Sequence, residues 1–149
     1  MRREDWARAT MKLDHIGIVV KKLESYGEAY ASSLGLTVDS PIYYDPIQKV
    51  RIQFWSDGHG GRLELIEAAS EDSPVKQALE KGRGLNHLCY EVNDIEARVQ
   101  EAANRGAILT SQIVPAVAFG GRRVAFLYFR ELGLIEFVEA NPAAPTTTL

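Results

Sequence analysis

The sequence predicts an α+β domain made of two tandem βαβββ modules. Short runs rich in β-branched residues alternate with two stretches of helical spacing, and the order of these segments repeats along the 149 residues. The repeat has a fixed offset, because adding 72 to His15 gives His87 and adding 72 to Glu64 gives Glu136. A constant offset between chemically matched residues indicates an internal duplication.

The first copy begins with a predicted strand, "KLDHIGIVV" (Lys12–Val20). A helix follows, with an apolar face expected at Leu23, Tyr26, Tyr30 and Leu34 and an end at Gly35. Two alternating runs, "KVRIQFW" and "RLELIEA", flank the turn residues "SDGHGG" and predict a hairpin. The segment Thr37–Tyr44 is the candidate for the remaining strand.

A short helix is predicted to link the copies over residues 73–83. Ser73 would cap it, Pro74 would occupy its first position, and Gly82 would end it. The second copy then repeats the order with the strand "NHLCYEV" and the helix "NDIEARVQEAANRGA". In that helix Ile95, Val99 and Ala102 are expected to face inward, and Gly106 to end it. The strand candidates that follow are Ala107–Val114, "RRVAFLYF" and "GLIEFVEA".

These segments predict one folded domain over residues 12–140, with module one at 12–72 and module two at 84–140. Residues 1–11 are charged and lack the apolar core of a signal peptide, so we expect a flexible lead-in. Residues 141–149 contain mainly Pro, Ala and Thr without periodicity, which predicts a disordered tail.

Composition excludes several classes of protein. The net charge of −3 and pI near 5.6 argue against a nucleic-acid binder. No apolar run approaches the length of a membrane span, so no membrane partner is expected. The single cysteine, Cys89, precludes an internal disulfide and is expected to be a small buried filler in a cytoplasmic protein.

Each copy supplies one histidine near the start of its first strand and one glutamate on its last strand. Glu64 and Glu136 both interrupt apolar strand faces, and a buried carboxylate without a partner is costly, so a cation is expected nearby. Taken singly, each of these residues would more often have a structural role, and their joint pattern is what favours a site. Two imidazoles and two carboxylates suit one divalent ion among Ni²⁺, Co²⁺, Mn²⁺, Fe²⁺ and Zn²⁺ without choosing one. A further glutamate pair, Glu67 and Glu139, has the same offset.

Several motifs resemble the vicinal-oxygen-chelate superfamily, in particular its glyoxalase I and methylmalonyl-CoA epimerase group. They are "LDHIGIVV", "KVRIQF", "RLELIEAASEDSPVKQALEKGRGLNHLCYEVNDIEA", "RRVAFL" and "GLIEFVE", and together they cover nearly all of residues 12–139. The resemblance implies an open, cupped mixed sheet, the glyoxalase/bleomycin resistance/dioxygenase fold, around one divalent metal ion. It also implies a possible homodimer. The family's metal ligands would be His15, Glu64, His87 and Glu136.

The resemblance further implies an isomerase or epimerase that transfers a proton through a metal-stabilised enolate, similar to methylmalonyl-CoA epimerase. Its substrate would be a small molecule, a CoA thioester. Glu136 matches the metal-bound base of the family, and Glu64 is the second catalytic candidate. Where some epimerases carry another glutamate, this sequence has Ile52, and it has "FLYFRELG" in place of a His-Pro-Lys type segment.

The same resemblance leaves two alternative functions open. A lactoylglutathione lyase (glyoxalase I) uses the same four ligands on a glutathione hemithioacetal, but neither the arginine expected after His15 nor the asparagine expected after Glu64 is present. A non-catalytic protein that binds a small molecule such as an antibiotic would have no need of four ligands. The segment Ile113–Gly121 is a candidate substrate lid, with Gly120 and Gly121 as its hinge.

Overall fold

A computed structural model describes residues 11–80 and 84–141. The predicted lead-in up to residue 10, the helix end at Gly82 and the tail from residue 142 lie outside the described residues. In chain order the elements are β1 Lys12–Val19, α2 Leu23–Leu34, β2 Thr37–Val38, β3 Tyr43–Asp45, β4 Val50–Ser56, β5 Arg62–Ala68, α3 Lys76–Glu80, β6 Leu85–Val92, α4 Ile95–Asn104, β7 Ile108–Leu109, β8 Val114–Pro115, the 3-10 turn η1 Val117–Phe119, β9 Arg123–Phe129 and β10 Gly133–Glu139. None of the helices described is long and apolar enough to cross a membrane.

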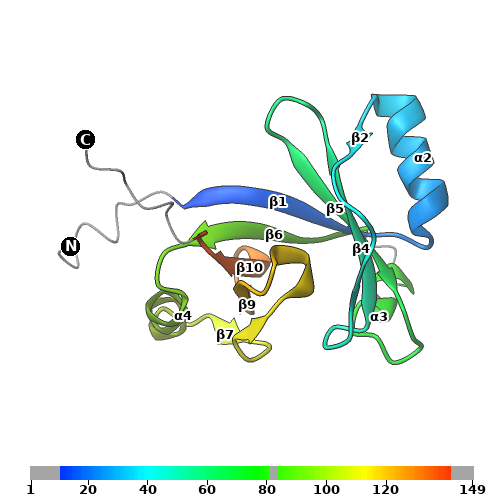
Figure 1. The fold of residues 1–149 in the computed structure, drawn as a ribbon. Helices are drawn as coiled ribbons and strands as arrows, with labels where there is room; N and C mark the ends of the chain where they lie inside the picture. Colours follow the sequence, from blue (N-terminus) through cyan, green and yellow to red (C-terminus); the bar gives the residue numbers. More distant parts are fainter. Residues whose placement is uncertain (1–10, 81–83, 142–149) are drawn as a thin grey trace, which may run out of the picture.

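The strands form one mixed sheet that is symmetric about its centre. Its order is β2-β4-β5-β1-β6-β10-β9-β7, with β3 beside β4 and β8 beside β9. The two central strands, β1 and β6, are antiparallel, and each has a parallel neighbour, β5 or β10, from its own half. Figure 1 shows β1 and β6 side by side, with the β4–β5 hairpin beyond one of them and β9 and β10 beyond the other. The predicted α+β fold of two repeated modules is confirmed.

Strand registers repeat with the same offset as the sequence. Gly17 pairs with Glu64 across β1 and β5, and Cys89 pairs with Glu136 across β6 and β10. The hairpins match as well, since Phe54 lies opposite Glu64 and Phe126 lies opposite Glu136. Both glutamates therefore occupy equivalent positions, each beside one of the two central strands.

The two strand candidates of uncertain extent are each broken into two short strands. Thr37–Tyr44 contains β2 and the start of β3, and Ala107–Val114 contains β7 and the start of β8. A serine hydroxyl replaces a backbone partner at each break. Ser40 Oγ accepts a hydrogen bond from the Phe54 amide, and Ser111 Oγ accepts one from the Phe126 amide. These side-chain bonds satisfy the backbone where strand pairing stops.

The helices pack on the outer face of the sheet, α2 against β4 and β5 and α4 against β7, β9 and β10. In α4 the prediction is confirmed, because Ile95, Val99 and Ala102 are buried. They extend a core cluster that also contains Leu127 and Phe137.

In α2 the predicted apolar face is partly wrong. Leu23 is buried, but Tyr26 and Leu34 are 38% and 67% exposed. The helix instead approaches β4 at Gly27, where a β-carbon would lie 2.5 Å from Cζ2 of Trp55. That close approach fixes the rotation of the helix. Its predicted end is confirmed by the left-handed conformation of Gly35 (φ 74°).

The linking helix differs from its prediction at the start. Helix α3 begins at Lys76, two residues after Pro74. Ser73 does not cap it, because the Ser73 hydroxyl donates to the carbonyl of Gln48. This bond ties the α3 segment to the turn before β4.

The second repeated glutamate pair has a structural role. Glu67 accepts hydrogen bonds from the Arg51 guanidinium, which also binds Glu24 in the first turn of α2. At equivalent positions of the other half, the Arg123 guanidinium binds Glu139 on β10 and Glu96 in the first turn of α4. Each arginine thus ties a helix to the sheet, at positions that differ by 72.

Candidate metal centre and active site

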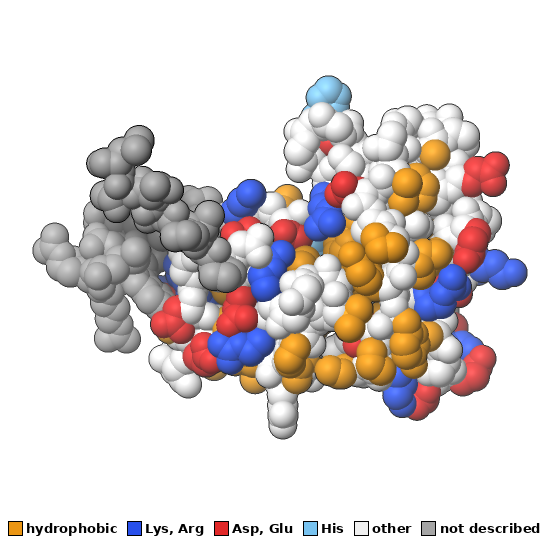
Figure 2. Space-filling view, in the orientation of Figure 1, with side chains coloured by type: hydrophobic (Ala, Val, Ile, Leu, Met, Phe, Trp, Pro, Cys, Tyr) orange, Lys and Arg blue, Asp and Glu red, His pale blue; other side chains and the backbone are white. Residues whose placement is uncertain are grey.

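The inner face of the cupped sheet encloses a cavity of about 430 Å³ to which both halves contribute. Its floor carries Glu64, His87 and Glu136, and its walls are largely apolar, with Ile52 and Val124 at equivalent positions of the two halves. Figure 2 shows hydrophobic side chains gathered over β4 and α3. The cavity therefore combines a few polar groups with an apolar wall, as small-molecule sites usually do.

The two central strands bring the predicted histidines together. His15 is on β1 and His87 is on β6, and both side chains are buried. Their Nε2 atoms are 3.2 Å apart. The antiparallel β1–β6 pairing produces this contact, because it places Gly17 beside His87 and Cys89 beside His15.

Strands β5 and β10, which flank the central pair, bring both glutamates to the same point. Glu136 Oε1, from β10, lies 3.3 Å from each of the two Nε2 atoms. The carboxylate of Glu64, from β5, lies 3.6 Å from His15 Nε2 and 3.7 Å from His87 Nε2. Both carboxylates are buried, so all four side chains predicted from the repeat converge in one enclosed cluster.

The hydrogen bonds of the two Nδ1 atoms, which face away from the cluster, indicate the protonation of the two Nε2 atoms, which face into it. His15 Nδ1 donates to the Asp14 carboxylate at 2.7 Å, and His87 Nδ1 donates to the Asn86 amide oxygen at 2.8 Å. With both Nδ1 atoms protonated, each neutral imidazole presents a lone pair at Nε2. Two lone pairs and two carboxylates then meet without a donor, so the cluster attracts a cation, either a proton on an imidazole or a metal ion.

The spacing of these atoms fits a small divalent ion. Ligand atoms that each lie about 2.1 Å from one ion are separated by roughly 3.0–3.4 Å. The separations of 3.2–3.7 Å among these nitrogens and oxygens are close to that range. Glu136 Oε1 is also buried without a hydrogen-bond partner among the described residues, as a ligand atom would be. The residues therefore fit a metal ion with mixed N/O ligands.

Without a metal ion, the close approach of these charged and buried groups shifts their pKa values strongly. Burial lowers the pKa of His15, but the Glu64 charge, the Asp14 hydrogen bond and Glu136 outweigh it and raise that pKa to about 10. Burial raises the pKa of Glu136, yet both histidines outweigh it and lower the pKa to about 2. For Glu64 burial dominates, so its pKa is raised. The two carboxylates thus differ in proton affinity despite their equivalent positions.

Three phenylalanines form an aromatic wall that sequence reasoning did not identify. Phe54 and Phe126 lie edge-on to His15 and His87 respectively, each at 5.3 Å between ring centroids. Phe119, from η1, stacks on His15 at 5.8 Å. The predicted lid segment is therefore packed on the site through a buried residue. Only the positions of Phe54 and Phe126, which differ by 72, were detectable in the sequence.

Gly17 is a second residue whose role becomes clear only in three dimensions. It lies opposite His87, and a β-carbon at position 17 would be 2.2 Å from Cε1 of that imidazole. The position equivalent to Gly17 is Cys89, which lies opposite His15. Small residues on the central strands thus leave space for both imidazole rings.

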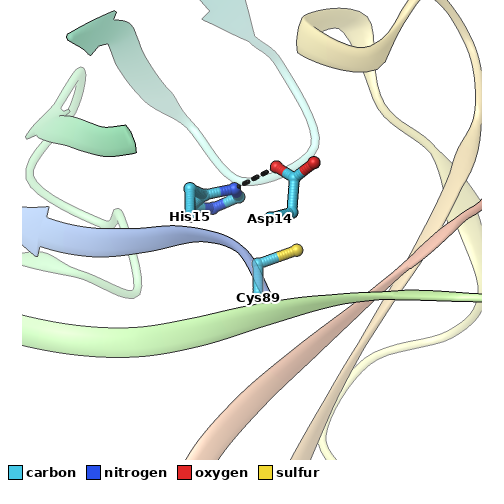
Figure 3. A group of neighbouring side chains, drawn as sticks. All are labelled: Asp14, His15 and Cys89. Atoms are coloured by element: carbon cyan, nitrogen blue, oxygen red, sulfur yellow. Dashed lines mark hydrogen bonds and ion pairs between the residues drawn. The ribbon is translucent and has the colours of Figure 1, made fainter. Parts of the chain in front are cut away.

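Cys89 lies beneath the His15 side of the cluster, close to Asp14 (Figure 3). It is completely buried. Burial, reinforced by the nearby charges of Glu136 and Asp14, raises the pKa of its thiol far above the usual range. Cys89 is therefore a neutral packing residue.

The chain matches the model of the glyoxalase/bleomycin resistance protein/dioxygenase superfamily over residues 14–126. The chain therefore belongs to this superfamily. The matched range includes three of the clustered side chains, and Glu136 on β10 follows it.

Its relatives include named epimerases. It is 32% identical to an ethylmalonyl-CoA/methylmalonyl-CoA epimerase of Cereibacter sphaeroides, over 78% of this chain and 87% of the relative. Among solved structures, it resembles a hypothetical protein from Bacillus halodurans (35% identity, TM-score 0.79, 91% and 99% of the two chains). It also resembles methylmalonyl-CoA epimerase from Mycobacterium tuberculosis (26% identity, TM-score 0.76, 91% and 96%).

Proposed function

We propose that this protein is a divalent-metal-dependent epimerase that moves the proton next to the carbonyl of a CoA thioester. One observation carries the proposal: two imidazole Nε2 atoms and two carboxylates, all buried, converge at the base of an apolar cavity. The named relatives support the substrate class. Solved epimerases 27% identical to this chain hold methylmalonyl-CoA or 2-nitronate-propionyl-CoA.

The proposed metal ligands are His15, Glu64, His87 and Glu136. A divalent ion bound there would act as a Lewis acid that polarises the thioester carbonyl and so acidifies the neighbouring C–H bond. The protein groups would orient the substrate and exclude water, with Phe119 and its neighbours closing the His15 side of the cavity.

Glu136 is the proposed base. Burial raises its pKa, but both histidines outweigh burial and lower it to about 2, so Glu136 is ionised at neutral pH. Glu64 has a raised pKa because of its burial, which suits a group that returns a proton. Environments that separate the pKa values of two carboxylates are typical of an acid–base pair.

Ile52 explains why the second proton-transfer group is assigned to Glu64. Ile52 is buried on β4 and lines the cavity, at the position where some epimerases carry a glutamate. Asp45 is the other carboxylate in the cavity wall among the described residues, and it accepts hydrogen bonds from the amides of Ile47 and Gln48 in its own turn. Epimerisation needs proton transfer on both faces, which leaves the pair Glu64 and Glu136.

The decisive experiment is solvent exchange by the Co²⁺-loaded wild-type protein in D₂O. We expect deuterium at the α-carbon of methylmalonyl-CoA or ethylmalonyl-CoA and loss of that exchange after chelation. Conversion of a methylglyoxal–glutathione hemithioacetal to a thioester would instead identify a glyoxalase. Absence of exchange with every thioester and hemithioacetal, together with tight binding of a bulky antibiotic, would identify a sequestering protein.

The proposal also includes a homodimer. Large hydrophobic side chains are exposed along the β2–β3 stretch and the following turn: Val38, Ile42, Tyr44 and Ile47. Exposed apolar patches of this kind commonly mark protein interfaces. Light scattering should give twice the mass of the 16.5 kDa chain, and Tyr44→Lys should lower it. A wild-type monomer at micromolar concentration would contradict the dimer without affecting the metal site.

A further inference from the structure

The two imidazoles of the cluster differ in the side chain that accepts the hydrogen bond from Nδ1. His15 donates from Nδ1 to a carboxylate, Asp14, whereas His87 donates from Nδ1 to a neutral amide, Asn86. Asp14 and Asn86 are equivalent positions, since 14 + 72 = 86. Figure 3 shows the Asp14–His15 bond, with the Asp14 carboxylate directed at the ring. An otherwise symmetric ligand set therefore has asymmetric support.

The surroundings of Asp14 are built for a negative charge. Its side chain is 15% exposed, and Arg62 Nη1 lies 3.9 Å from Asp14 Oδ2. Arg62 is itself held in place, because its Nε donates to Asp39 at 3.0 Å and its guanidinium lies 3.8 Å from the Phe54 ring centroid. At the position equivalent to Arg62 the other half has Leu134. This arginine contact is therefore specific to the His15 side of the cluster among the described residues.

The acceptor behind a metal-bound histidine changes that histidine as a ligand. A carboxylate accepts a stronger hydrogen bond than an amide oxygen does, because the bond is charge-assisted. A stronger bond at Nδ1 fixes the ring orientation and makes Nε2 a better electron donor. His15 should therefore bind a metal ion more tightly than His87 does.

We propose that Asp14 is a positioning residue that makes His15 the anchoring ligand of the metal site, leaving the half that contains His87 and Glu136 as the more labile side. This inference rests on the proposed metal-dependent function. It also suits that function, because a base must be able to exchange a metal contact for a proton, and Glu136 lies on the labile side.

The first test measures Co²⁺ affinity by competition with a chelator. Asp14→Asn reproduces the arrangement at Asn86 and keeps an acceptor for His15, so only the charge is lost. We expect binding about 10- to 100-fold weaker than in the wild type. Asp72→Asn is the matched control, because Asp72 is an exposed carboxylate paired with Lys49 away from the cluster. It should leave the affinity within about twofold of the wild type.

The outcomes separate the two proposals. If the wild type binds Co²⁺ and Asp14→Asn binds it equally well, the positioning role of Asp14 is wrong while the metal site stands. If the wild type shows neither Co²⁺ binding nor its d–d absorption, the proposed function fails and the positioning role fails with it.

A second test uses the wild-type protein and does not depend on the folding of a variant. In Zn²⁺-loaded protein labelled with ¹⁵N, long-range ¹H–¹⁵N spectra report the protonated nitrogen of each imidazole. We expect both rings to carry the proton at Nδ1, with the proton of His15 further downfield than that of His87. A His15 ring protonated at Nε2, or the reverse order of the two shifts, would overturn the inference.

Discussion

The two halves of this molecule agree closely in scaffold and differ around the metal cluster. Strand register and the ion pairs of Arg51 and Arg123 recur at the offset of 72, and the serines that end strand pairing, Ser40 and Ser111, recur at an offset of 71. Behind the histidines, however, Asp14 corresponds to Asn86 and Arg62 corresponds to Leu134. Duplication has thus preserved what folds each half and what donates to the cluster, while the environment of each donor has diverged. Equivalent residues can therefore perform different chemical roles.

The largest expected effect breaks the equivalence of the glutamates. Glu136→Gln should slow α-proton exchange by about 1,000-fold, because an amide cannot act as a base. Glu64→Gln should still allow exchange of one epimer with retention but should abolish inversion. Isotope exchange and epimer ratio, measured by NMR, distinguish the two.

Glu139→Gln is the matched control for these variants. Glu139 is on the same strand as Glu136 but binds Arg123 outside the cavity. It should leave exchange within about twofold of the wild type, since exposed ion pairs contribute little. Equal losses from Glu64→Gln and Glu136→Gln, with inversion intact in neither, would mean that the halves act identically.

The next effect concerns pH. The pKa of His15 in the protein without metal is raised from 6.5 to about 10, so below pH 10 a metal ion must displace its proton. We expect Co²⁺ affinity to rise about tenfold per unit between pH 7 and pH 9. Chelator competition across this range measures the slope, and a flat profile would contradict the raised pKa.

The same shift predicts a change in stability without metal. A raised folded-state pKa stabilises the fold fully below pH 6.5, and this contribution is lost as the pH rises from 6.5 to about 10. Urea unfolding of chelator-treated protein should therefore give a lower free energy of unfolding at pH 9.5 than at pH 6.5. Saturating Co²⁺ should reduce that difference.

A smaller effect is expected where the central strands meet. Gly17→Ala places a methyl group against His87 and should weaken Co²⁺ binding about tenfold, at a stability cost of about 1–3 kcal/mol. Cys89→Ala removes a sulfur at the equivalent position and should cost about 1 kcal/mol without changing metal affinity. Chelator competition measures the affinities and thermal unfolding measures the stabilities. Equal losses of Co²⁺ affinity in the two variants would contradict this prediction.

The smallest effect tests the part of the comparison in which the halves agree. Arg51→Gln and Arg123→Gln each remove the ion pairs that tie a helix to the sheet. The two arginine side chains are 35% and 39% exposed. Each substitution should lower the melting temperature only slightly, equally in the two halves and without effect on Co²⁺ binding, because exposed ion pairs contribute little to stability. Thermal unfolding measures the change in stability. A loss of metal binding in either variant would show that these ion pairs also position the cluster.

The sequence was sufficient to predict the duplicated fold and all four side chains of the cluster, because the offset of 72 links His15 to His87 and Glu64 to Glu136. Asp14 and Asn86 also carried a detectable signal, since each directly precedes a histidine. Phe119 and Gly17 did not, because their roles depend on what lies opposite them in space. The exposed side of α2 was misjudged for the same reason, as the Gly27–Trp55 contact that rotates the helix joins distant segments.

The central position of β1 has a consequence for how the chain folds. Ile16 pairs with Leu63 on one edge and with Leu88 on the other, partners that follow it by 47 and 72 residues. Strand β1 therefore gains its parallel neighbour β5 only after 47 further residues, and its antiparallel neighbour β6 only after 72. Such non-local pairing slows folding, so we expect refolding on a millisecond-to-second timescale. During synthesis the first half should remain open at β1 until β6 arrives, and the two histidines should come together only in that late step.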